Sequence, residues 1–168
     1  MSLNFYQASV PVFVKFLNNL ESLLKTAESY GQSKKLDPSV LLQSRLFPDM
    51  FPLLRQVQIA ADFAKSVSAR LAGVEVPSYE DTEQSYADLY QRLDKTRQFL
   101  LSIPEAAFAD AASREVVLRP GTEKEKRFAS TADYLLHYGL PQFYFHVTTA
   151  YAILRHNGVE VGKKDFMG

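Results

Sequence analysis

Long apolar stripes at helical spacing constrain the fold of this chain more than any other feature. Between Val10 and Ala27, apolar residues recur every three or four positions, which is the spacing of one face of an α-helix. Similar stripes cover residues 49–72, 86–103 and 130–156, separated by proline, glycine and polar residues. Because each helix must bury one face, a four-helix bundle is the economical arrangement. The sequence therefore predicts an all-α fold.

Residues with strong backbone preferences predict where these helices begin and end. We expect the first helix to stop at Gly31 and the second to begin with Asp49 as its N-cap. Ser78 and Asp81 have the spacing of a capping box ahead of the third helix. The fourth helix is expected to start at Ser130 and to end before the pair Asn157-Gly158.

A short β-hairpin is predicted between the third and fourth helices. Val116 and Leu118 lie in one strand-like stretch and Phe128 lies in another. Pro120 and Gly121, which are typical of tight turns, stand between them. No repeat or change of composition divides the chain, so we expect one domain over residues 1–168.

Charge and cysteine content exclude several classes of function. The 168 residues include 19 Lys or Arg and 19 Asp or Glu, so the excess of positive charge typical of nucleic-acid-binding or membrane-binding proteins is missing. There are no cysteines, which excludes disulfides, thiolate metal sites and a cysteine nucleophile. The sequence shows neither a signal-peptide pattern nor an apolar run long enough to span a bilayer. We therefore expect a cytoplasmic protein.

Polar residues beside the apolar stripes are the candidates for a ligand pocket. On a helical wheel, an inward direction is defined by Leu136, Phe143, Val147, Ala150 and Leu154. His146 and Gln142, four residues apart, lie together on one flank of this direction. Asp49 and Gln56 lie on one flank of the second helix. His137 and His156 point elsewhere, so this helix cannot supply a three-histidine set.

His146 has three interpretations. It is a structural histidine hydrogen-bonded to Gln56 or Asp49, a polar group that contacts a small ligand, or a metal ligand. A zinc or nickel site is the weakest of these, because amide oxygens are poor substitutes for imidazole. Pro141 removes one helical N–H and is expected to kink the helix near His146, unless the helix starts a second time there.

Aromatic side chains are concentrated at the start of the fourth helix. Tyr134, Tyr138 and Phe145 lie away from the inward stripe, which indicates a second buried surface. A homodimer interface or a pocket rim is one explanation, and coverage by the hairpin is another.

Three segments of the chain resemble a known family: residues 6–24 (YQASVPVFVKFLNNLESLL), residues 46–65 (LFPDMFPLLRQVQIAADFAK) and residues 140–166. They are similar to a bacterial domain of unknown function within the DinB/YfiT-like superfamily of metalloenzyme-related bundles. The resemblance covers nearly the whole chain. It implies an up-down-down-up four-helix bundle that is frequently dimeric, and it brings no established activity.

The resemblance also bears on the site. Active members of the superfamily, such as thiol-dependent S-transferases, typically bind a divalent metal through three histidines. His146 corresponds to the last of these, Gln142 occupies the position of another, and Gln56 or Asp49 would have to replace the third. It also implies that the two polar flanks face each other. We therefore expect a small ligand or partner bound in a polar pocket with a degenerate metal site; the alternative is a divalent-metal-dependent transferase or isomerase.

Overall fold

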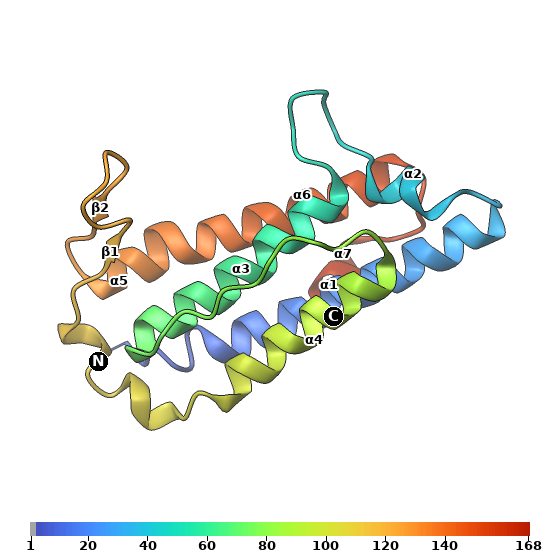
Figure 1. The fold of residues 1–168 in the computed structure, drawn as a ribbon. Helices are drawn as coiled ribbons and strands as arrows, with labels where there is room; N and C mark the ends of the chain where they lie inside the picture. Colours follow the sequence, from blue (N-terminus) through green and yellow to red (C-terminus); the bar gives the residue numbers. More distant parts are fainter. Residues whose placement is uncertain (1–2) are drawn as a thin grey trace.

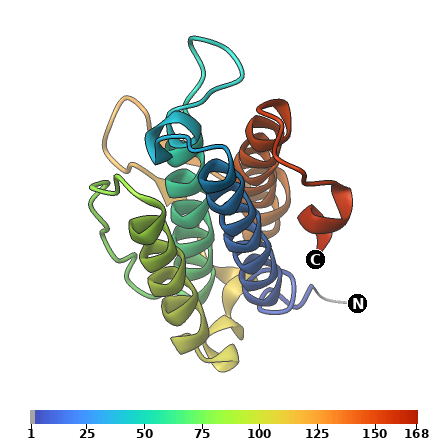
Figure 2. The ribbon, with the colours of Figure 1, turned by 90° about the vertical axis from the view of Figure 1, so that its right-hand side faces the viewer.

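Four long helices pack side by side in the structure, a computed structural model that describes residues 3–168. They are α1 (Val10–Ser33), α3 (Leu53–Ala72), α4 (Tyr86–Ser102) and a composite fourth helix that ends with α6 (Leu140–His156). Viewed from the end, their axes surround one core (Figure 2). The predicted helical bundle is confirmed.

The order of directions is up-down-down-up. In Figure 1, α1 and α6 run one way along the bundle, and α3 and α4 run the other way. Because α3 and α4 are consecutive and parallel, the chain must return along the whole bundle between them. The extended segment 74–84 does this, lying over the two helices that it connects (Figure 1).

Three of the predicted helix ends differ from the structure. The first helix continues past Gly31 to Ser33, and Lys35 rather than the glycine takes the left-handed conformation, with φ of 55°. The second helix begins at Leu53, because Pro52 keeps an extended backbone, and Asp49 lies outside it in an exposed loop.

The capping box of α4 is also formed by different residues from those predicted, and these lie further along the chain. Two Ser-x-x-Asp motifs begin before α4, and the second one caps the helix: the Asp88 N–H donates to Ser85 Oγ, and the Ser85 N–H donates to Asp88. Asp81, from the first motif, forms ion pairs instead.

The fourth helix contains a five-residue π turn. Ser130 caps α5 (Thr131–Tyr134) as predicted, the π turn covers Leu135–Gly139, and α6 follows with Pro141 in its first turn. The N–H of Leu140 donates to the carbonyl of Leu135, five residues earlier. The disturbance expected at Pro141 thus takes the form of a widened turn just before it.

The π turn shifts the faces of the helix relative to a uniform wheel. Leu136, predicted to point inward, is 44% exposed, whereas Leu135 is fully buried. An extra residue in one turn rotates all preceding side chains by about 100°. The uniform helical wheel therefore predicts the buried side chains correctly from Phe143 onward and incorrectly before Gly139.

Gly139 lets the fourth helix approach α3 closely. A Cβ atom at this position would lie 2.9 Å and 3.1 Å from the two methyl groups of Val67. Only glycine fits this contact without a shift of one helix. Within the core, Phe13 of α1 packs edge-on against Phe143 of α6, with ring centroids 4.8 Å apart, and both side chains are fully buried.

The short elements lie at the ends and sides of the bundle. They are α2 (Pro38–Leu42), the 3-10 helices Glu105–Phe108 and Ala111–Ser113, β1 (Val117–Leu118), β2 (Lys126–Arg127) and α7 (Lys163–Met167). The strands form the predicted antiparallel hairpin, with Val117 opposite Arg127. Within residues 3–168, no helix is long and apolar enough to cross a membrane.

The hairpin covers part of the aromatic surface predicted on the fourth helix. Phe128 packs against Tyr134 and Tyr138, with centroids 5.0 Å and 5.2 Å apart, and Tyr134 is only 1% exposed. Phe145, further along the same helix, remains 56% exposed. The second buried surface is therefore real at Tyr134 and does not extend to Phe145.

Candidate functional site

His146 and Gln56 form a buried polar pair between α6 and α3. The His146 Nδ1 atom lies 2.7 Å from Gln56 Oε1, which confirms the predicted hydrogen bond. Both side chains are almost fully buried, and the ring of Phe63 stacks on the imidazole with centroids 5.9 Å apart. The flank of α3 that carries Gln56 and Phe63 thus faces the flank of α6 that carries His146.

The hydrogen bonds of Gln56 determine the tautomer of His146. Gln56 Nε2 donates to the carbonyl oxygen of Phe51 at 3.0 Å, a group that can only accept. The amide oxygen is therefore directed to His146, and it also can only accept. It follows that Nδ1 of His146 carries the proton and that, in the neutral ring, Nε2 is an unprotonated acceptor.

The imidazole is held neutral by its surroundings. Burial, and then the positive charge of Arg55, lower the pKa of His146 to about 4. At neutral pH the ring is therefore uncharged, and its Nε2 lone pair is available. No residue that the structure describes forms a hydrogen bond with Nε2.

The other two predicted pocket residues are not part of this pair. Gln142 lines a neighbouring hollow of about 370 Å³, together with Tyr138, Pro141, Phe145 and His137. The Phe145 ring lies edge-on to His146, with centroids 5.2 Å apart, and His146 itself does not line the hollow. Asp49 lies in the exposed loop before α3, because that helix starts four residues later than predicted.

The side chains around His146 do not fit the three-ligand metal site of the superfamily. Nδ1 of His146 and both ends of the Gln56 amide are engaged in hydrogen bonds, which leaves only Nε2 as a nitrogen ligand. Within residues 3–168, no group of three His, Asp or Glu side chains is placed to hold an ion. Zinc and nickel sites are built mainly from imidazole, thiolate and carboxylate groups.

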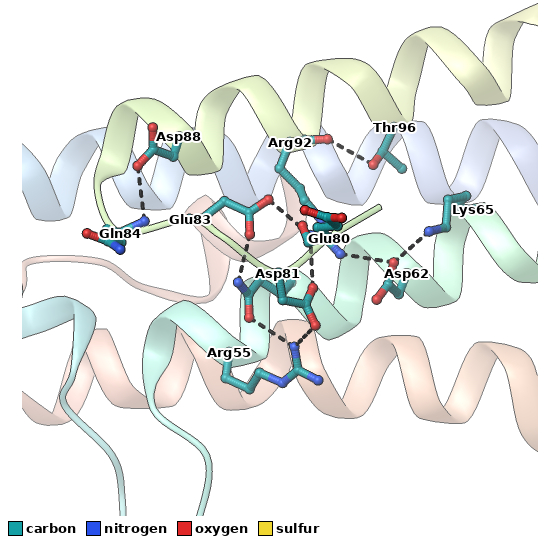
Figure 3. A network of polar contacts seen from close by, with 11 residues as sticks. Arg55, Asp62, Lys65, Glu80, Asp81, Glu83, Gln84, Asp88, Arg92 and Thr96 are labelled. Atoms are coloured by element: carbon teal, nitrogen blue, oxygen red, sulfur yellow. Dashed lines mark hydrogen bonds and ion pairs between the residues drawn. The ribbon is translucent and has the colours of Figure 1, made fainter. Parts of the chain in front are cut away.

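A buried ion-pair network around Arg92, which the sequence interpretation missed, lies on the opposite side of α3. Arg92 projects from α4 with a side chain only 2% exposed, and it lies 3.0 Å from the carboxylates of Asp62, Asp81 and Glu83 (Figure 3). It also donates to the carbonyl of Glu80 at 3.0 Å. Burial alone would lower the pKa of Arg92, but these carboxylates raise it above the usual value.

This network fastens the returning segment 74–84 to the bundle. Arg55 of α3 pairs with Asp81, and Gln58 donates to Glu83 at 2.7 Å. The ring of Tyr79 lies between Lys65 of α3 and Lys95 of α4, each 4.1 Å from its centroid. A signal for it does exist in the sequence: Arg92 lies directly beside the apolar stripe formed by Leu89, Leu93 and Leu100.

Comparisons with known proteins agree with this architecture. The family described as Domain of unknown function (DUF1993) matches residues 5–167. A crystal structure described as a DinB family member protein from Shewanella denitrificans is similar to this chain, with 44% sequence identity and a TM-score of 0.91. That match covers 97% of this chain and 91% of the other. None of the curated proteins matches significantly. The chain therefore belongs to the DUF1993 family, and it has the fold of a DinB family member.

Proposed function

We propose that the protein binds a small organic molecule beside α6 and that this binding does not depend on a metal ion. The observation that carries the proposal is the fixed, neutral state of His146. Gln56 holds the proton on Nδ1, so Nε2 is presented permanently as a hydrogen-bond acceptor. A hydroxyl, amine or thiol of a ligand is the group that such an acceptor binds.

The neighbouring hollow supports this proposal. Its walls combine the aromatic rings of Tyr138 and Phe145 with two polar side chains, Gln142 and His137. Small-molecule sites are typically apolar clefts with few polar groups, at volumes of about 300–1,000 Å³. Phe145 lines the hollow and contacts the His146 ring, so the hollow lies next to the imidazole.

A thermal-shift screen tests the proposal. Purified protein is heated with divalent metals, low-molecular-weight thiols and small organic acids, because any ligand of the folded state raises the melting temperature. We expect an organic compound to stabilise the protein in the presence of EDTA and to lose its effect in His146→Asn. That variant keeps a donor to Gln56 in the place of Nδ1 and lacks Nε2.

His156→Asn is the matched control, since His156 lies on the exposed face of the same helix. It should respond to ligands like the unaltered protein. Stabilisation by zinc or nickel alone would contradict the proposal. So would stoichiometric transition metal in elemental analysis that disappears in His146→Ala, and either result would favour a metal-dependent transferase.

We further propose that the protein is a cytoplasmic homodimer. Leu136 and Phe145 are large apolar side chains that remain 44% and 56% exposed on the fourth helix. Pairing of two copies through this helix would remove them from water. The lack of cysteines is compatible with a reducing compartment.

A further inference from the structure

A second pocket lies under the hairpin, and its electrostatic character differs from that of the rest of the molecule. Its volume is about 220 Å³, and its lining comes from α3, the hairpin and the start of the fourth helix. The lining residues are Phe63, Ser66, Arg70, Leu118, Arg119, Lys124, Lys126, Tyr134 and Tyr138. Four of these are cations, and within residues 3–168 no Asp or Glu lines the pocket. The chain as a whole has no net charge.

The four cations have no partners of opposite charge. Arg127, next to them on β2, pairs with Glu115 and Glu125 on the other side of the hairpin. In the part of the chain that the structure describes, Arg70, Arg119, Lys124 and Lys126 form no ion pair. Like charges gathered at one pocket repel one another, and a bound anion would relieve this repulsion.

Tyr134 supplies an unused hydrogen-bond donor at the same place. Its hydroxyl oxygen accepts from Arg70 Nη1 at 3.3 Å, and its side chain is 1% exposed. Burial raises the pKa of Tyr134, with only partial opposition from Arg70, so the hydroxyl keeps its proton. That proton has no acceptor among the described residues. The guanidinium of Arg70 uses Nη1 for its two hydrogen bonds and leaves its other N–H groups free.

The rest of the pocket is aromatic and apolar. Tyr134 and Tyr138 stack with centroids 6.0 Å apart, and Phe63 meets Tyr138 at 5.9 Å. Lys126 lies over the ring of Tyr138, 4.5 Å from its centroid, so its ammonium group sits at the border between the rings and the other cations. A ligand that fits this lining needs both an anionic group and a flat apolar body.

We propose that this pocket binds a small aromatic anion, with a carboxylate or phosphate held by Arg70, Lys126 and Tyr134 and an aromatic ring packed on Tyr138 and Phe63. The volume is below the range of about 300–1,000 Å³ typical of drug-sized ligands, which limits the ligand to a single ring. The site is distinct from the hollow beside Gln142, although Tyr138 borders both hollows and Phe63 also stacks on His146.

Calorimetric titration at low and at physiological salt tests this site with defined probes. They are benzoate, phenyl phosphate, inorganic phosphate and the neutral benzyl alcohol. We expect benzoate or phenyl phosphate to bind, to bind more weakly at higher salt, and to bind more tightly than the other two. Lys126→Gln should weaken binding by about tenfold, as expected for the loss of a charge-assisted contact.

Arg127→Gln is the matched control, because it removes a neighbouring cation on the opposite side of the hairpin. It should leave the affinity unchanged. Tyr134→Phe is a second variant that removes only a hydroxyl, and it should also weaken binding.

The proposal is overturned if neither aromatic anion binds, or if Lys126→Gln and Arg127→Gln weaken binding equally. Equal binding of benzyl alcohol would show an apolar site without anion recognition. Equal binding of inorganic phosphate would show that the aromatic wall contributes nothing. Each of these results contradicts the ligand class stated above.

Discussion

The Nδ1 atom of His146 lies 2.7 Å from the amide oxygen of Gln56, across the contact between α6 and α3. This hydrogen bond links α3 and α6 at the two polar flanks that are predicted to form a pocket. In this chain an amide and an imidazole hydrogen-bond to each other there. The arrangement satisfies the Gln56 amide and Nδ1 of His146, and it leaves Nε2 of His146 without a hydrogen bond among the described residues.

The first prediction concerns the pH dependence of stability. The pKa of His146 is about 4 in the folded protein and about 6.5 when unfolded, so between these values the unfolded chain binds more protons. Stability from this group is therefore present above pH 6.5 and is lost as the pH falls toward 4. We expect a loss of about 3 kcal/mol in the free energy of unfolding over this range.

Urea unfolding at pH 7 and pH 4.5 measures this effect. His146→Asn should show a smaller loss between the two values than the unaltered protein, and His156→Asn should show the same loss. Identical pH dependence in all three proteins would mean that His146 is not held neutral.

The second prediction concerns Arg92. In Arg92→Met the carboxylates of Asp62, Asp81 and Glu83 would remain together without their central cation. Breaking such a buried pair costs about 3–5 kcal/mol of folding stability. Arg127→Met, which removes an exposed ion pair, should cost no more than about 1 kcal/mol.

Hydrogen exchange locates the effect of Arg92. Residues 74–84 should exchange faster in Arg92→Met than in the unaltered protein, because Arg92 holds this segment against α3 and α4 (Figure 3). Unchanged exchange in this segment would show that other contacts hold it.

The third prediction concerns the contact at the π turn. Gly139→Ala places a methyl group against Val67 and should destabilise the protein by about 1–3 kcal/mol. Gly31→Ala is the matched control: its new methyl group meets only Leu41, at 3.8 Å, within a helix. We expect it to stabilise the protein by about 0.5–1 kcal/mol.

Thermal unfolding measures the stability of both variants. The same measurement on Gly139→Ala in a Val67→Ala background tests the contact itself. The cost of Gly139→Ala should be smaller once Val67 is shortened. The same cost in both backgrounds would mean that the two residues do not limit the approach of the helices.

The fourth prediction concerns assembly. Light scattering at micromolar concentration should give twice the 19.0 kDa mass of the chain. Leu136→Lys should shift the protein toward monomer, because it places a charge on the exposed apolar surface of the fourth helix that Leu136 and Phe145 form. A monomer in the unaltered protein would contradict the proposed dimer.

The sequence by itself determined the helical bundle and the hairpin. Apolar periodicity specifies which face of a helix is buried, and the turn pair Pro120-Gly121 specifies a reversal of the chain. These features depend on local pattern, which a single sequence contains. Helical spacing also placed His146 and Gln56 beside buried stripes, but their pairing was expected only from the resemblance, with Asp49 as the alternative partner.

Only the tertiary structure decided the features that depend on contacts between distant segments. The π turn moved Leu136 outward and Leu135 inward, a change of register that uniform helical spacing does not contain. Of two identical capping motifs, Ser85 and Asp88 cap α4, because Asp81 is engaged by Arg55 and Arg92. The cations under the hairpin likewise come from two segments, α3 and the hairpin, and only folding places Arg70 beside the other three.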